Sequence, residues 1–199
     1  MFTFTTMQEA EEHLAQALSS ERFLESAGNF SSSSSFIAPY PASLAGSEAQ
    51  TVAKLAGDLA AKGVRAAAAD AFGLTVEILD EQGDWDWLIE EEHEMKVTPR
   101  ELAEDLCCAV DVEGALVPRI EERAQGGGAQ LLIVHGMGAC WPFLRTHQLL
   151  TLLNPGVPVL VMFPGSYSQL PDGTTSLDAL DTPPGEGGGH YRARNIFDL

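Results

Sequence analysis

The sequence predicts an α/β fold with a mainly parallel sheet of four or five strands flanked by helices. Residues 131–134 and 159–163 are uninterrupted apolar runs in which apolar and polar residues do not alternate. Strands of this kind are buried on both faces, as in a parallel sheet. Helical patterns separate the predicted strands, and that order implies parallel strands joined by right-handed crossovers. With 199 residues, the chain is expected to form one domain over residues 1–199.

The N-terminal elements are predicted from capping and turn signals. Thr6 precedes Glu9 by three residues, which is the spacing of a capping box, so a helix is expected to begin there. Residues 28–35 include a run of serines and are expected to form a flexible loop. The apolar start of residues 36–41 predicts a strand, which two prolines end.

The next helix and strand follow from the same signals. Ser47 and Gln50 repeat the capping-box spacing, and Gly63 stands where a helix C-terminal glycine belongs. Residues 64–69 predict a strand, although its alanines make the pattern weak. Asp70 is suited to cap another helix directly after that strand.

The C-terminal half continues the alternation of helices and strands. Thr98 is followed by Pro and then by Glu at the third helical position, so a helix is predicted to run to about residue 112. Residues 142–154 predict the helix between the two buried strands. Residues 165–189 are rich in Gly, Pro, Ser and Asp and predict a long surface loop. The tail at residues 191–197 is a candidate edge strand.

The composition argues against several classes of function. Lys and Arg total 11 against 29 Asp and Glu, a formal net charge of −18. Direct nucleic-acid binding is not expected, because it needs cations that displace counterions from phosphate. Docking on anionic lipid is disfavoured for the same reason. No apolar run reaches the roughly 20 residues of a membrane span.

The N-terminus and the cysteines predict a cytoplasmic location. The first 18 residues are acidic and lack the basic region that begins a secretory signal. The chain has three cysteines, and two of them, Cys107 and Cys108, are adjacent, so a disulfide framework is not expected.

Acidic residues concentrate in the middle of the chain. Residues 76–125 hold 16 acidic and four basic residues. Such a stretch is typical of a solvated helical face that keeps a protein soluble. A docking surface for a basic partner is the alternative.

A nucleotide site is weakly supported. The outline of the predicted fold is P-loop-like, but the GxxxxGK[ST] motif, called Walker A, is missing, so no Lys and Ser/Thr pair is available for phosphates and magnesium. Residues 40–47 have the length of such a loop without its Lys. His135 stands where a P-loop enzyme places a metal-organising Asp. A degenerate nucleotide-binding sensor therefore stays open as an alternative, and no cofactor is predicted.

A cysteine nucleophile is the enzymatic alternative. Cys140 follows a Gly-x-Gly turn and precedes a predicted helix, whose N-terminus could lower the pKa of the thiol. His135 or His147 would supply the base. The same three residues match no defensible zinc-ligand spacing, and a buried, inert cysteine is the common structural explanation.

Three stretches resemble the BrxB family, formerly a domain of unknown function. They are residues 132–147, residues 159–167 and residues 191–193, and the resemblance extends over about residues 19–197. The positions that match the family motif are Gly136, Gly138, Trp141, Pro142, Arg145, His147, Pro164, Gly165, Tyr191 and Arg192.

The resemblance implies a non-enzymatic part of a bacterial BREX or phage-growth-limitation defence complex. Family members act beside a PglZ protein, an ATPase and a DNA methyltransferase, and a PglZ-like protein is the expected direct partner. No catalytic residue is carried over. Trp141, Arg145 and Arg192 would form either a pinned structural corner or a partner contact, since Trp and Arg are favoured interface anchors.

Overall fold

The structure is a computed structural model that describes residues 4, 6–20, 23, 35–83, 86, 89–90, 98–169, 175–178 and 193–198. Its main sheet has five strands in the order β2-β3-β4-β1-β7, and every pairing in it is parallel. The strands are β1 (Ser35–Tyr40), β2 (Ala66–Asp70), β3 (Leu131–His135), β4 (Val159–Pro164) and β7 (Arg194–Asn195). The predicted α/β fold is therefore confirmed, whereas its P-loop-like outline is not.

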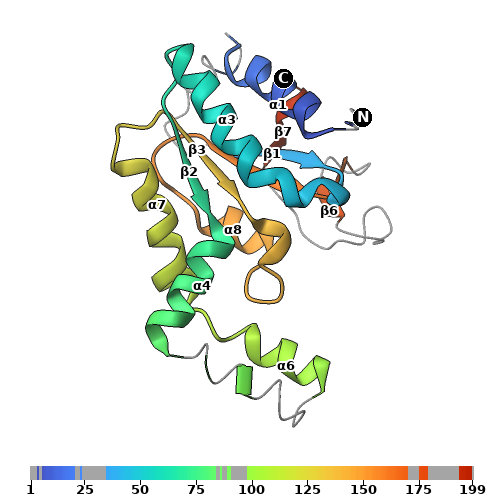
Figure 1. Ribbon diagram of the computed structural model, residues 1–199, viewed down its shortest axis with the longest axis vertical. Coiled ribbons are helices and arrows are strands. Elements are labelled where there is room, and N and C mark those ends of the chain that lie inside the picture. The colour runs from blue at the N-terminus through green and yellow to red at the C-terminus, as the bar shows by residue number, and fades with distance from the viewer. Residues whose placement is uncertain are drawn as a thin grey trace.

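Helices cover both faces of the sheet (Figure 1). They are α1 (Met7–Leu18), α3 (Glu48–Ala61), α4 (Ala71–Gln82), α6 (Pro99–Leu106), α7 (Val117–Gln125) and α8 (Thr146–Leu152). The first two pack on one face of the sheet, and α4, α7 and α8 pack on the other. In Figure 1, α1 and α6 lie at opposite ends of the long axis.

The central strands β3 and β4 have only buried residues, as their apolar runs predict. Their side chains alternate between two cores. Leu131 and Ile133 of β3 face α1 and α3, whereas Leu132 and Val134 face the core beside α4 and α7. Each fully buried side chain of this size contributes about 1.5–3 kcal/mol, so the two central strands supply much of the stability.

Local signals set most helix ends correctly. The Thr6 hydroxyl accepts the Glu9 N–H at 3.2 Å, and Thr98 and Glu101 form a complete capping box. Asp70 caps α4 by accepting the Gly73 N–H at 3.1 Å. The expected cap at Ser47 is wrong, because its side chain makes no capping bond and a 3-10 helix, η1 (Ala42–Ser47), leads directly into α3.

Two predicted helices are shorter than expected. The helix from Thr98 ends at Leu106, because the chain then turns to bury Val110 and Val112 in the core; a π-helix, η2 (Val112–Leu116), follows. The helix expected over residues 142–154 is only α8, since Arg145 has an extended backbone just before it.

The two predicted loops also need correction. The surface loop expected over residues 165–189 contains an antiparallel pair, β5 (Ser166–Gln169) and β6 (Thr175–Asp178). Ladder hydrogen bonds between these two segments outweigh the turn-favouring composition on which the prediction rested. Ser35, the last residue of the expected serine-rich loop 28–35, already belongs to β1, and residues 28–34 lie outside the described part.

The C-terminal tail adds an edge strand, as predicted. Arg194 and Asn195 pair in parallel with Phe36 and Ile37 of β1. Within the described residues, no helix combines the length and the apolar character needed to cross a bilayer.

Candidate functional site

The carboxyl ends of four parallel strands meet at one edge of the sheet. Asp70 is paired with His135 in the register of β2 and β3, and Tyr40 is paired with Pro164 in the register of β1 and β4. Ligands of open parallel sheets bind outside this edge. The candidate site is therefore built on the turns that follow these strands.

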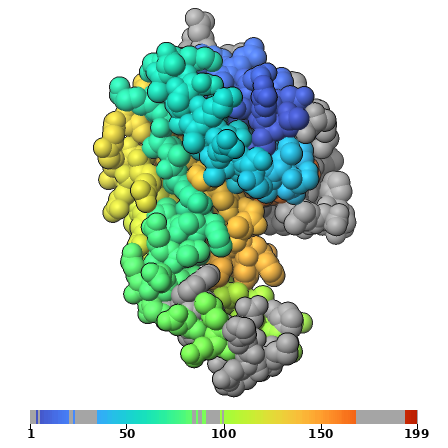
Figure 2. Space-filling view, viewed as in Figure 1, coloured from blue at the N-terminus to red at the C-terminus, as the bar shows by residue number. Residues whose placement is uncertain are grey.

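A cavity of about 820 Å³ opens at this edge. Its lining comes from η1, from the start of α3 and α4, from the turn after β3, from the residues that lead into α8, and from the end of β4. In the space-filling view, the orange segment that follows β3 reaches the surface between the light blue η1 and the green α4 (Figure 2). We call this region the carboxyl-edge cavity.

The turn after β3 depends on two glycines. Gly136 has a φ of +80°, and a Cβ atom there would collide with Asp70 Oδ1 and lie 3.2 Å from the backbone nitrogen of Phe72. A Cβ atom at Gly138 would lie 2.9 Å from Pro164 Cγ. Both glycines therefore have a steric role, because they let the turn pack against neighbouring strand ends.

A buried carboxyl group lies under this turn. Glu48, the first residue of α3, has only 5% of its surface exposed, and its Oε2 accepts the Gly136 N–H at 3.1 Å. Oε1 has no hydrogen-bond partner among the described residues, and neither has the Tyr40 hydroxyl. Tyr40 nevertheless adjoins the carboxyl closely enough to favour its charged form.

Burial dominates the acid–base properties of Glu48. Desolvation raises its pKa to about 7, while the Gly136 N–H and Tyr40 lower it and the charge of Asp70 raises it further. The same burial raises the pKa of the Tyr40 hydroxyl far above its usual range. Glu48 therefore changes charge near neutral pH.

The environment of His135 favours its neutral imidazole over the charged form. Burial lowers its pKa, and the carboxylate of Asp70 opposes that shift. His147 also lines the cavity and is half-buried. Among the described residues, no cluster of three or more His, Cys, Asp and Glu side chains is arranged to hold a metal ion.

Cys140 belongs to the hydrophobic core. Its side chain is fully buried, and its Sγ donates to the Gly136 carbonyl oxygen at 3.3 Å. Burial, with the charges of Asp70 and Glu48, raises the pKa of the thiol to about 12. Because the thiolate is the nucleophile, this environment disfavours the cysteine-dependent enzyme considered above.

The residues after Cys140 are more exposed. The Trp141 side chain is 64% exposed, which is unusual for so large an apolar group, and Arg145 is exposed beside the same cavity. The Trp141–Pro142 peptide bond is cis, and the buried Pro142 accepts a hydrogen bond from Cys107 Sγ at 3.3 Å. Trp141 is therefore presented to solvent from a turn that is itself anchored.

The structure brings together most of the residues singled out by the sequence. Gly136, Gly138, Trp141, Arg145, His147 and Pro164 line the carboxyl-edge cavity, while the Gly165 N–H donates to the Tyr40 carbonyl oxygen at 2.9 Å beside it. Tyr191 and Arg192 lie outside the described residues.

Sequence reasoning missed the cavity role of Glu48. Its position after Ser47 indicates only the start of a helix. Glu48 and Gly136 are 88 residues apart, so no local pattern shows that they form a hydrogen bond.

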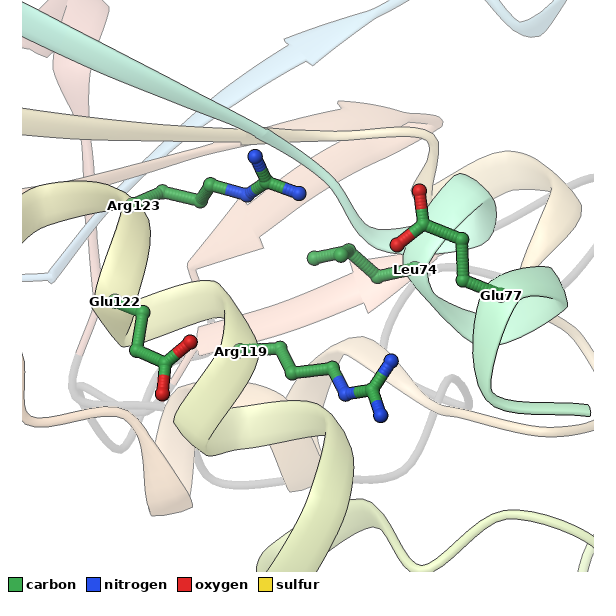
Figure 3. A pocket seen from close by; sticks show the side chains of 5 residues that line it. All are labelled: Leu74, Glu77, Arg119, Glu122 and Arg123. Carbon is green, nitrogen blue, oxygen red and sulfur yellow. The ribbon is translucent and has the colours of Figure 1, made fainter. Parts of the chain in front are cut away.

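A second, more polar pocket of about 640 Å³ lies between α4 and α7. Figure 3 shows Arg119 and Arg123 extending from α7 toward Leu74 and Glu77 of α4. Arg119 is already paired with Glu81, and the other charged lining residues are exposed. Solvent screens such groups, so this pocket is the weaker candidate.

A comparison of the sequence with models of known protein families identifies the family of this chain. The family model described as BREX protein BrxB matches residues 67–196, which is well over half of the chain. The chain belongs to the BrxB family. The matched range includes the turn after β3, whereas β1 and the start of α3, with Tyr40 and Glu48, precede it.

One curated BrxB-family relative supports this assignment. The chain is 26% identical over 102 residues to the BREX protein BrxB of Escherichia coli O9:H4 (strain HS). The alignment spans 50% of this chain and 50% of that relative, so the match extends over about half the length of the relative. No solved structure matches the chain.

Proposed function

We propose that this BrxB-family chain is a non-catalytic adaptor in a BREX-type bacteriophage-resistance complex. It binds a PglZ-like protein through a surface made of Trp141, Arg145 and the cavity lining beside them, which we call the carboxyl-edge surface. Family membership supports a place among BREX components. The exposure of Trp141 carries the rest of the proposal, because a 64% exposed Trp contributes little to folding.

The setting of Trp141 favours a partner contact over a structural corner. A pinned corner would bury the ring and pair Arg145, but Arg145 is exposed and makes no ion pair with the described residues. Trp and Arg are enriched among residues that dominate interface energetics, particularly beside a pocket. The buried Cys140 and Leu144 flank the turn and hold its backbone in place.

The experiment measures binding of the purified chain to the PglZ-like protein of its own defence system by isothermal titration calorimetry. Trp141→Ala is expected to weaken binding about 30-fold, which corresponds to the roughly 2 kcal/mol of an interface hot spot. Ile89→Ala is the matched control, because Ile89 is another exposed large apolar residue, 42% exposed. Equal affinities for wild type, Trp141→Ala and Ile89→Ala would refute this binding surface.

A further inference from the structure

The Glu48 carboxyl group, which is buried and lines the carboxyl-edge cavity, forms no ion pair with the described residues. Glu48 Oε2 accepts the Gly136 N–H, and Oε1 has no hydrogen-bond partner among the described residues. An ionised carboxylate in such a place is costly unless it is paired. The cost is relieved either by a proton or by a cationic ligand that enters the cavity.

The charges that line the cavity favour a cationic ligand. Glu48 and Asp70 are the acidic lining residues, and Arg145 is the one Arg or Lys among the described lining residues. Arg145 is exposed, so solvent screens its charge, whereas the environment of Glu48 screens charge weakly. A phosphate group is disfavoured by the same arrangement, which weakens the case for a nucleotide sensor.

The remaining lining specifies what kind of cation fits. Besides Trp141, the cavity is lined by apolar side chains that include Ala45, Leu144 and Phe163. A cavity lined by carboxylates and an aromatic ring suits a guanidinium group, which can stack on a ring and donates in a planar fork. A metal ion fits less well, because the described residues provide no three-ligand cluster.

We propose that the carboxyl-edge cavity is a socket for an arginine side chain of the protein partner, with its guanidinium group directed to Glu48 and Asp70 and stacked on Trp141. This inference rests on the proposed adaptor function and names the chemistry of the partner segment. Apolar residues that flank the arginine would fill the rest of the cavity. The net charge of −18 supports attraction of a basic segment.

Binding of arginine to the socket depends on pH. Glu48 ionises near pH 7, so affinity is expected to rise between pH 6 and pH 8. The other titratable or charged groups that line the cavity are Asp70, His135, Arg145 and His147, and the side chains of Tyr40 and Cys140 interact with Glu48 from outside the lining. Protonation of His135 at lower pH would also weaken the binding of an arginine side chain. Comparing the pH dependence of binding in Glu48→Gln and in wild type separates the contribution of Glu48 from that of His135.

The test uses the blocked peptide acetyl-Ala-Arg-Ala-amide, and the matching peptide with citrulline, which is nearly isosteric but uncharged. Titrations are followed by the NMR signals of the Gly136 amide and the Trp141 indole. The arginine peptide is expected to give a saturable shift and to bind about tenfold more tightly than the citrulline peptide, as loss of a hydrogen bond to a charged group implies. Equal binding of the two peptides, or no binding of either, would overturn the socket.

Two variants test whether the charge of Glu48 itself binds the arginine peptide, one at Glu48 and one as its matched control. Glu48→Gln keeps an acceptor for the Gly136 N–H, and Asp58→Asn removes the same charge from an exposed position on α3. About tenfold weaker binding of the arginine peptide to Glu48→Gln, with Asp58→Asn unchanged, supports the socket. Equal losses in both variants would overturn it.

The two proposals fail in different ways. If Trp141→Ala loses the PglZ-like protein but the arginine peptide does not bind wild type, the adaptor surface stands and the socket is refuted. If the peptide binds in a Glu48-dependent way but Trp141→Ala retains the PglZ-like protein with full affinity, the assignment of that partner to this surface is refuted.

Discussion

Gly136→Ala tests how closely the turn after β3 packs against the start of α4. Gly136 has a φ of +80°, and a left-handed backbone costs a non-glycine residue roughly 1–2 kcal/mol. The new Cβ atom would also displace the Asp70 carboxylate, which caps α4 through the Gly73 N–H. Loss of such a cap costs about 1 kcal/mol. Disturbing the hydrogen bond from Gly136 to Glu48 adds about 1 kcal/mol, so the total is about 3–4 kcal/mol.

Gly63→Ala is the matched control. Gly63 has nearly the same φ, +83°, but among the described residues, its chain neighbours aside, no heavy atom lies within 4 Å of the position its Cβ would take. It should therefore lose only the backbone contribution, roughly 1–2 kcal/mol. Urea unfolding followed by circular dichroism measures both free energies of unfolding, and the expected difference of about 2 kcal/mol corresponds to a Tm difference of about 4–8 °C. Equal destabilisation by the two substitutions would refute the close packing between the turn and Asp70.

Three further predictions concern burial at and around the site. Because the pKa of Glu48 in the folded protein is raised to about 7, its proton stabilises the fold at low pH, and this contribution is lost as pH rises from about 4.5 to 7. The measurement is the difference in unfolding free energy between wild type and Glu48→Gln, in which the opposite pKa shift of His135 cancels because both proteins contain it. In urea titrations this difference should change by about 2–3 kcal/mol between pH 4.5 and 7. A difference that stays constant with pH would contradict the raised pKa of Glu48. In the folded protein, Ellman's reagent should react quickly with the two exposed cysteines and slowly with Cys140, which becomes reactive on unfolding; rapid reaction of all three would be inconsistent with its burial. Trp141→Ala should change the free energy of unfolding by less than about 1 kcal/mol, whereas Ile120→Ala, at a fully buried position, should lower it by about 2–5 kcal/mol. Similar losses of stability in the two variants would argue against an exposed Trp141.

The sequence alone determined the main architecture, because the signals that specify it are local. The apolar runs that became β3 and β4 predict strands buried on both faces, and the structure buries every residue of both. The capping pattern at Thr98 likewise depends on residues three positions apart, and its capping box forms as predicted.

Tertiary packing decided the lengths of several elements. The helix that begins after Thr98 ends at Leu106, although the sequence allows a longer helix. It ends there because the chain turns to bury Val110 and Val112 in the core. The β5–β6 pair forms between segments that a composition-based reading assigns to a loop. Pairing and burial outweigh local preferences in both cases.

The chemistry of the candidate site also came only from the tertiary structure. Trp141 and Arg145 stand out in the sequence, but whether they are buried or exposed depends on the surrounding fold. The buried Glu48 carboxyl arises because α3 begins beneath a turn 88 residues further along the chain. The pKa of a side chain depends on its solvent exposure and on neighbouring charges, and packing between distant segments sets both.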